Sequence, residues 1–313
     1  MGCASIAARS VIPAIKANPH YELVAIASRN QSKAEEFTRR FGGKPIAGYA
    51  QLLQEQLDAV YMPLPTGLHE EWVTAALNAN LHVLAEKSFG MDAASTHRMT
   101  QLARQKQRVV AENFMFEHHS QQAFLRKLLE DGAIGEIRRF SASFGFPGLA
   151  PDNFRYDPLV GGGALLDAGA YTIKASQWLL GPQLRVLGST LQYASPQQAD
   201  VGGSALLANN RGIPAQLSWG FTHFYQCGYE IWGSKGKITT NRSFTAAPGF
   251  MPSLRLEQPN QIQEWQLPAD DHFYNLLSWF AQCVQAGQVE PCALALDNQS
   301  QLLDAVRQAA QKP

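Results

Sequence analysis

LDAVYMPLPTGLHEEWVTAALNANLHVLAEK, residues 57–87, contains a complete strand–helix–strand unit. The apolar run at 57–62 predicts a buried strand, which ends at two prolines because proline cannot donate to a central ladder. Residues 69–80 predict a helix, and residues 81–85 predict the following strand. Two strands joined through a helix in this way indicate parallel neighbours in one sheet.

The same alternation continues on both sides of this unit. Further strands are predicted at residues 21–27 and 109–111, and further helices at 31–41, 51–56 and 93–106. Strands that alternate with helices through short links predict an α/β Rossmann-type domain with a doubly wound parallel sheet over residues 1–115. Ligands bind to such sheets at the carboxyl ends of the strands.

The second half of the chain shows runs of strands instead of alternation. Strands are predicted at residues 137–146, 184–193, 203–208, 215–224, 229–232, 237–240, 253–256 and 261–267, and helices at 117–130, 164–180, 272–286 and 297–311. The turn at 209–212 joins two of these strands as a hairpin. Such runs predict an α+β domain with a mainly antiparallel open sheet over residues 116–313.

Composition excludes several functional classes. The formal net charge is zero and no basic block occurs, so a nucleic-acid or anionic-membrane surface has no electrostatic support. No apolar run reaches about 20 residues, and the start of the chain lacks the pattern of a secretory signal. The four cysteines have no metal-type spacing and indicate reduced thiols. We therefore expect a soluble, cytoplasmic protein of two domains.

The amino terminus carries a nucleotide-binding pattern. Its residues are Gly2, Cys3, Ala4, Ser5, Ile6 and Ala7. They have the spacing of the dinucleotide fingerprint, with alanine in place of the second and third glycines. Small residues allow backbone amides to approach a pyrophosphate at the start of the following helix. A central strand normally leads into this turn, so we expect an upstream segment that supplies the missing first strand.

Ser28 and Arg29 follow the strand predicted at residues 21–27. An acidic residue at this place binds the ribose hydroxyls of NAD and repels a 2′-phosphate, whereas a hydroxyl beside a guanidinium attracts the phosphate. The pair therefore predicts NADP(H) as the preferred cofactor, with NAD(H) possible. The alternative interpretation of Arg29 is a solvated arginine in a loop.

A lysine and a tyrosine form the candidate catalytic pair. Lys87 closes the strand at 81–85, and GGGALLDAGAY, residues 161–171, follows about eighty residues later. Its glycine-rich turn opens a helix on which Asp167 and Tyr171 share a face at i, i+4 spacing. Carbonyl reduction needs one group that polarises the carbonyl and another that supplies a proton. The alternative is a surface lysine and a half-buried helix tyrosine.

Together these motifs resemble the glucose–fructose oxidoreductase, inositol dehydrogenase and MocA family (Gfo/Idh/MocA). ENFMFEHH, residues 112–119, and the tyrosine that ends Asp-x-Gly-x-Tyr are most similar to NADPH-dependent 3-ketoreductases of nucleotide-linked deoxysugars. The sequence departs from the family at Ser88, where proline usually follows Glu-Lys, and in the missing first strand. The resemblance implies an oxidoreductase that transfers a hydride between nicotinamide and a sugar carbonyl or hydroxyl.

The resemblance also implies roles for individual residues. Lys87 and Tyr171 flank the substrate carbonyl, and Tyr171 donates the proton while Lys87 stabilises the alkoxide. Asp167 orients Lys87 or the hydroxyls of substrate or ribose, or else caps a helix. Tyr229 faces the sugar or is an ordinary strand aromatic. The further cofactor contacts implied are Tyr49, Leu64, Pro65, His69, Glu86, Lys87, Asn113 and Arg155, although His69 has the alternative of simply starting a helix.

No metal site is expected. His118 and His119 are adjacent, so on a helix their side chains point about 100° apart, and no acidic residue or cysteine stands at ligand spacing.

Alternating aromatics at 217–221 and 229–232 predict a sheet that is apolar on one face. The family resemblance implies that the open side of this sheet pairs with another subunit, giving a homodimer or homotetramer. Two functional alternatives stay open: a non-catalytic nucleotide or sugar sensor, and a dehydrogenase of another polyol or dihydrodiol. The sequence does not determine which sugar or which carbon is involved.

Overall fold

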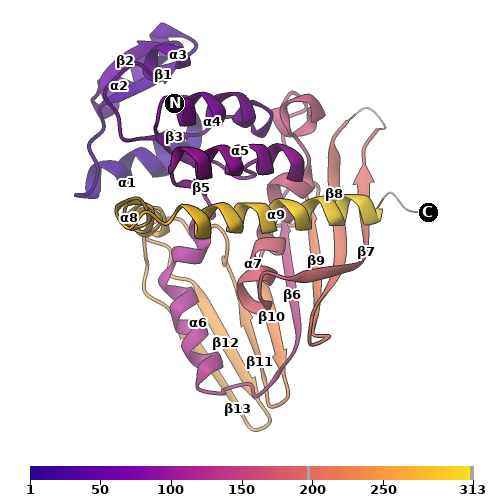
Figure 1. Cartoon of the computed structure of the whole chain (residues 1–313). Helices are drawn as coiled ribbons and strands as arrows, with labels where there is room; N and C mark the ends of the chain where they lie inside the picture. The colour runs from indigo at the N-terminus through magenta and orange to yellow at the C-terminus, as the bar shows by residue number, and fades with distance from the viewer. Residues whose placement is uncertain (196–197, 311–313) are drawn as a thin grey trace. The chain divides into compact units, whose positions relative to one another are not determined.

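The computed structural model describes residues 1–195 and 198–310 and divides into two compact units (Figure 1). Unit 1 contains Met1–Phe114 and Phe273–Ser300, and unit 2 contains Met115–His272 and the residues from Gln301 onward. Unit 1 therefore ends one residue before the predicted boundary at 115. Residues 273–300 return to unit 1, however, whereas the sequence placed them in the second domain.

Unit 1 alternates short parallel strands with helices. Its strands are β1 (Ala25–Ser28), β2 (Lys44–Ala47), β3 (Ala59–Met62), β4 (His82–Ala85) and β5 (Val110–Glu112). Its helices are the π-helical turn Ala7–Val11, α1 (Ile12–Ala17), α2 (Gln31–Phe41), α3 (Tyr49–Leu52), the 3₁₀ turn Thr66–Leu68, α4 (His69–Asn78), α5 (Ala93–Lys106), most of α8 (His272–Gln285) and the first half of α9 (Val289–Ala310). This arrangement confirms the predicted Rossmann-type domain.

The parallel sheet of unit 1 is in two parts. β1 pairs with β2, and β4 lies between β3 and β5, all in parallel. The amine of Met1 donates to the Tyr61 carbonyl at 2.8 Å, and the Gly2 amide donates to the Ala27 carbonyl at 2.8 Å. An apolar cavity of about 110 Å³ lies beside them, lined among others by Ile26. The two parts meet where the sequence predicts a further central strand.

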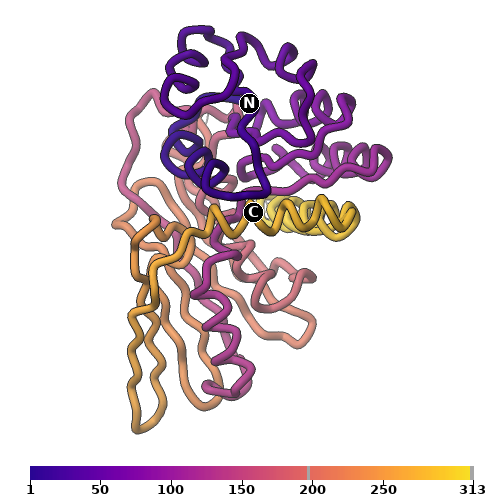
Figure 2. Tube along the Cα trace, turned by 90° about the vertical axis from the view of Figure 1, so that its left-hand side faces the viewer, coloured from indigo at the N-terminus to yellow at the C-terminus, as the bar shows by residue number. Residues whose placement is uncertain are grey.

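The carboxyl-terminal helices, yellow in Figure 2, explain why residues 273–300 belong to unit 1. The Tyr21 hydroxyl donates to the Leu277 carbonyl at 2.7 Å. Asp297 accepts a hydrogen bond from Thr100 at 2.8 Å and pairs with Arg104 at 3.1 Å. These contacts join α8 and α9 to elements more than 190 residues earlier in the chain, a separation at which helical periodicity carries no information.

Unit 2 contains an eight-stranded sheet in the order β13-β12-β11-β10-β6-β9-β8-β7. The pairs are antiparallel except β6–β9, which is parallel, and the hairpin turn before β9 is where it was predicted. The strands are β6 (Ile137–Gly145), β7 (Leu184–Tyr193), β8 (Asp200–Asn209), β9 (Pro214–Gly220), β10 (Gln226–Gly233), β11 (Lys237–Thr240), β12 (Ser253–Gln258) and β13 (Gln261–Gln266). The predicted mainly antiparallel sheet is confirmed.

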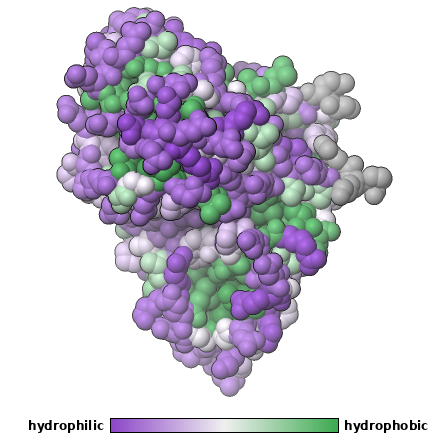
Figure 3. Space-filling model, viewed as in Figure 1, coloured by the Kyte–Doolittle hydropathy of each residue, from purple (hydrophilic) through white to green (hydrophobic). Residues whose placement is uncertain are grey.

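Helices of unit 2 cover one face of this sheet. They are the 3₁₀ turn Met115–His118, α6 (Ser120–Glu130), the π-helical turn Leu165–Gly169 and α7 (Ala170–Leu180). Alternate strand residues such as Phe140, Trp219 and Ile231 are buried beneath them. Figure 3 shows apolar surface, bordered by hydrophilic residues, in the region of α6 and α7. The predicted helix at 297–311 is part of α9, and Gln311 lies outside the described residues.

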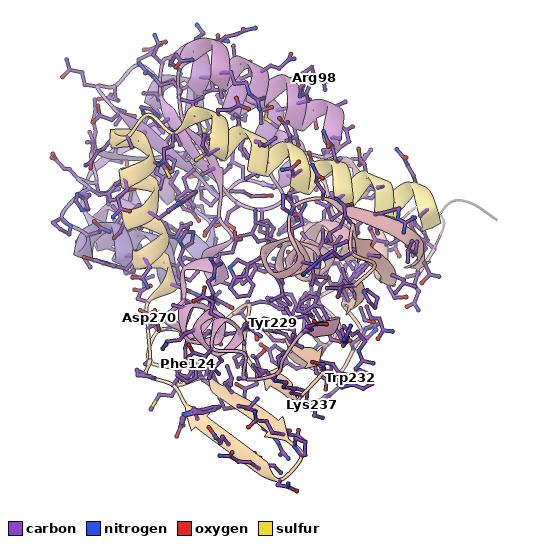
Figure 4. The ribbon with its side chains drawn as sticks, turned by 60° about the horizontal axis from the view of Figure 1, so that its bottom comes forward. Arg98, Phe124, Tyr229, Trp232, Lys237 and Asp270 are labelled. Atoms are coloured by element: carbon purple, nitrogen blue, oxygen red, sulfur yellow. The ribbon has the colours of Figure 1, made fainter. Side chains whose placement is uncertain are left out.

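The opposite face of the sheet carries charged side chains together with exposed apolar ones such as Trp232 and Leu206. Arg139 of β6 pairs with Glu230 of β10 at 2.7 Å, and its guanidinium lies 4.8 Å from the centre of the Trp232 ring. Lys237 of β11 extends this row of charges to Glu257 at 3.3 Å. Figure 4 labels Trp232 and Lys237 on these neighbouring strands. Among the described residues, no helix is long and apolar enough to cross a bilayer.

Candidate active site

The turn that begins at Gly2 has the shape of an anion site. Gly2 has a φ of +99°, and a Cβ there would lie 2.9 Å from the Leu64 side chain, so only glycine fits. A helix starts directly after the turn at Ser5. Backbone amides at a helix start attract phosphate. Ala7, in contrast, is buried in a cluster with Ile26 and Phe41 and serves the core.

Ser28 and Arg29 lie at the carboxyl end of β1. Ser28 is buried, and its hydroxyl accepts the Asn30 amide at 3.2 Å, whereas Arg29 is exposed. Burial raises the pKa of the nearby Tyr49, and the adjacent Arg29 guanidinium opposes this shift. The Tyr49 ring packs edge-on against Trp72 at 5.2 Å. The structure therefore brings the predicted 2′-phosphate ligands and Tyr49 to one place.

His69 is fully buried at the first residue of α4. Its Nε2 lies 2.9 Å from the Leu64 carbonyl and its Nδ1 lies 3.1 Å from the Phe89 carbonyl. Burial lowers the pKa of His69, so the neutral ring donates to one of these two oxygens. Both ring nitrogens of His69 therefore contact carbonyl oxygens of unit 1. This favours the interpretation that His69 simply starts the helix. Its carbonyl partner Leu64 lies against Gly2, and Pro65 is the next residue of the chain.

Glu86 and Asn113 hold the ends of three strands together. One Glu86 carboxylate oxygen accepts the Tyr61 hydroxyl at 2.6 Å and the Asn113 side-chain amide at 2.7 Å. Burial raises the pKa of Glu86, and these two hydrogen bonds oppose the shift. The Oδ1 of Asn113 is buried and has no hydrogen-bond partner among the described residues, so it remains able to accept a donor from a ligand.

Lys87 comes directly after Glu86, at the carboxyl end of β4. The carboxylate of Glu112 accepts the Phe89 amide at 2.7 Å, which anchors the segment two residues beyond Lys87. The Lys87–Ser88 peptide bond is cis, at the position where the resemblance expects proline in place of Ser88. Lys87 is therefore carried by a short segment anchored on both sides.

Asp167 in unit 2 pairs with Arg155. The Arg155 Nε donates to the Asp167 carboxylate at 2.6 Å, and both side chains keep some exposure. The Gly163 amide donates to the Arg155 carbonyl at 2.8 Å, so the glycine-rich turn also rests on this segment. Arg155, predicted as a cofactor contact, is placed by the structure as the partner of Asp167.

Tyr171 is 5% exposed and points into an aromatic cluster. Its hydroxyl donates to the sulfur of Met115 at 3.6 Å. The rings of Phe116, Phe144 and Phe244 have their centres 5.2 to 5.9 Å from its own. A thioether is a weak acceptor, so a stronger acceptor on a ligand can replace it.

Tyr229, labelled in Figure 4, is also buried. Its hydroxyl donates to the side-chain oxygen of Gln122 on α6, and burial raises its pKa. Its ring packs against Phe140 at 5.5 Å. This is the environment of a core aromatic that joins α6 to the sheet, which favours the strand-aromatic interpretation over a sugar contact.

Two contacts near Tyr171 were not predicted from the sequence. Asp200, the first residue of β8, accepts the Leu165 amide at 2.7 Å and caps the helix that carries Asp167 and Tyr171. Lys174 forms an ion pair with Glu117 at 3.7 Å. An acidic residue at the start of an apolar strand was the available signal for Asp200, but only the fold shows what it touches.

Two protein-family descriptions match this chain, one in each half. Residues 1–114 match the description "Oxidoreductase family, NAD-binding Rossmann fold", and residues 123–239 match "GFO/IDH/MocA C-terminal domain". The chain belongs to the GFO/IDH/MocA family of oxidoreductases. The resemblance inferred from the motifs is thereby confirmed.

Several members of this family are similar over nearly their full length. A dTDP-3,4-didehydro-2,6-dideoxy-alpha-D-glucose 3-reductase of Actinomadura kijaniata is 43% identical, with 99% of this chain and 94% of the relative covered. A reductase of the same name from Streptomyces violaceoruber is 42% identical with the same coverage. The crystal structure of a 3-ketoreductase from Actinomadura kijaniata with NADP and TDP-benzene has a TM-score of 0.94 at 42% identity, covering 98% of this chain and 95% of that one.

Proposed function

We propose that this protein is an NADPH-dependent reductase of a nucleotide-linked ketosugar. The observation that carries the proposal is the similarity to a 3-ketoreductase crystallised with NADP and TDP-benzene. The similarity covers nearly the whole of both chains and includes both units. NADH remains a weaker alternative cofactor.

Lys87 and Tyr171 are the proposed catalytic residues. Crystal structures of the related 3-ketoreductase include variants in which a lysine or a tyrosine was replaced. Those two positions are separated by the same number of residues as Lys87 and Tyr171. This agreement supports assigning both residues to the reaction.

The residues of unit 1 fit the proposed cofactor. The turn at Gly2 would hold the pyrophosphate, and Ser28 with Arg29 would hold the 2′-phosphate. The free acceptor oxygen of Asn113 at the strand end would receive an amide donor. When bound, the cofactor supplies the hydride. Glu86 keeps Asn113 in place because their side chains are hydrogen-bonded.

The chain supplies the charge stabilisation and the proton. Lys87 polarises the sugar carbonyl and stabilises the developing alkoxide. The Tyr171 hydroxyl donates the proton to that oxygen. Asp167 holds Arg155 beside the first turn of its helix, and its exposed edge can orient a substrate hydroxyl.

We also propose that the protein is a cytoplasmic homo-oligomer, a dimer or tetramer joined through the open face of the unit 2 sheet. The four cysteines are unbridged, as expected for a reducing compartment. Exposed apolar residues on the sheet, including Trp232 and Leu206, would be covered by a second copy.

Turnover of NADPH tests the proposed function. The purified protein is mixed with NADPH and a dTDP-linked 3-keto-deoxysugar, and nicotinamide absorbance is followed over a single turnover. Oxidation of NADPH that requires the keto sugar supports the proposal. Binding of both ligands without oxidation would instead indicate a sensor.

A further inference from the structure

The buried carboxylate of Asp200 lies against the start of the helix that carries Asp167 and Tyr171. Its Oδ2 accepts the Leu165 amide at 2.7 Å, and the Ala164 amide also faces it. A helix start leaves backbone amides without partners, and a carboxylate satisfies them and complements the helix dipole. Asp200 thus caps this helix from a strand that lies 35 residues further along the chain.

The glycine-rich turn is closely confined between Asp200 and the Arg155 segment. Gly163 has a φ of +124°, and a Cβ there would lie 2.4 Å from Asp200 Oδ1. On the other side, a Cβ on Gly162 would lie 2.5 Å from the Arg155 carbonyl. The Ala199 amide donates to the Tyr156 carbonyl at 3.2 Å, which joins the two confining segments. The position of the first helical turn therefore depends on Asp200.

We propose that Asp200 is a positioning residue for the reaction: its carboxylate fixes the helical turn that presents Asp167 and Tyr171. This inference rests on the proposed function, since it assigns Asp200 to the same site. Asp200 acts through Leu165 and the helix, not by contact with substrate. Small displacements of reacting groups cost large factors in rate, so a cap of this kind is expected to affect kcat.

The ionisation of Asp200 falls within an accessible pH range. Burial raises its pKa to about 6, against the opposing effects of the backbone amides and of Arg307 on α9. Two further titratable groups belong to this environment: Tyr193 on β7, and Asp304, which pairs with Arg307 at 2.6 Å. As the pH falls through about 6, the carboxylate is protonated and its charge-assisted bonds to the helix start weaken. The parent kcat should therefore fall on this acid limb.

Asp200→Asn tests the inference because it resembles the protonated acid and does not titrate. We expect kcat at pH 7.5 to fall by roughly 3- to 10-fold and the profile to lose its inflection near pH 6. Asp200→Ala should lower kcat further, while the NADPH Kd stays within about twofold of the parent. Asp152→Asn, at an exposed acid of the same unit, is the matched control and should keep the parent profile.

The outcomes separate this inference from the proposed function. If the parent turns over and Asp200→Asn keeps both its kcat and its acid limb, the inference is overturned and the proposed function stands. A change in thermal stability alone, with kcat unchanged, would likewise reduce Asp200 to a structural cap. If the parent does not oxidise NADPH with any dTDP-linked 3-keto sugar, the proposed function fails and the inference falls with it.

Discussion

Two buried tyrosines of unit 2 differ in the acceptor to which their hydroxyl donates. Both Tyr171 and Tyr229 are buried, with 5% exposure. Tyr229 donates to the strong acceptor Gln122, whereas Tyr171 donates to the sulfur of Met115. A thioether is a weaker acceptor than an amide oxygen, so a ligand displaces Met115 from Tyr171 more readily than Gln122 from Tyr229, in agreement with the proposed role of Tyr171 as proton donor.

This contrast predicts opposite results for two matched substitutions. Tyr171→Phe should lower the single-turnover rate by roughly 10²- to 10⁴-fold, the usual contribution of a positioned general acid. Tyr229→Phe should keep the rate but lose about 1–3 kcal/mol of unfolding free energy, because Gln122 loses its partner. Stopped-flow oxidation of NADPH and chemical denaturation measure the two effects. Equal rates for Tyr171→Phe and the parent would show that another group carries the proton.

Arg29 is the residue proposed to set the preference between the two cofactors. Arg29→Asp removes the charge that attracts the 2′-phosphate and adds one that repels it, so NADPH should bind roughly 10- to 100-fold more weakly while NADH binds as well or better. Fluorescence titration gives both Kd values. Arg39→Asp, at an exposed arginine of α2, is the control and should leave the preference unchanged. A parent protein with equal Kd values would refute the assignment.

Among the elements of unit 1, β1 and β3 belong to separate parts of the parallel sheet and do not pair with each other. The Met1 amine is buried against the Tyr61 carbonyl, and burial lowers its pKa to about 5 from an ordinary value of 8.0. The folded state therefore binds this proton less tightly than the unfolded state. Unfolding free energy should rise as the pH increases from about 5 to 8 and level off above. Denaturation at several pH values measures this slope.

An apolar extension of about six residues before Met1 should stabilise unit 1. The extension converts the amine to an amide, adds hydrogen bonds to both β1 and β3, and fills apolar space beside Ile26. We expect a higher Tm, by an amount equivalent to several kcal/mol, and loss of the Met1 contribution to the pH slope between 5 and 8. An extension of equal length made of glycine and serine removes the amine without filling the cavity. If the two extended proteins have the same Tm, filling the cavity does not contribute to stability.

At the scale of the whole molecule, the open face of the unit 2 sheet is the proposed contact between copies. Trp232→Asp places a charge on this face and should shift the mass measured by light scattering at micromolar concentration toward the monomer. Leu294→Asp alters a comparably exposed apolar residue on α9 and should not change the mass. A parent protein that is monomeric under these conditions would contradict the proposed assembly.

The order and type of most elements follow from local signals in the sequence. The predicted helices at 31–41 and 93–106 match α2 and α5 since Asn30 and Asp92 cap their starts. β2 was missed because Lys-Pro-Ile-Ala contains no apolar run. The family and the candidate residues Lys87, Asp167 and Tyr171 also followed from short motifs.

Which side chains meet could be seen only in the folded protein. It paired Arg155 with Asp167, enclosed His69 and Tyr229 in their own units, returned residues 273–300 to unit 1, and brought Asp200 to the helix start. Contacts between residues far apart in the chain leave no periodic trace in the sequence, because periodicity reports only which face of an element is buried. The partner that covers that face is decided by packing.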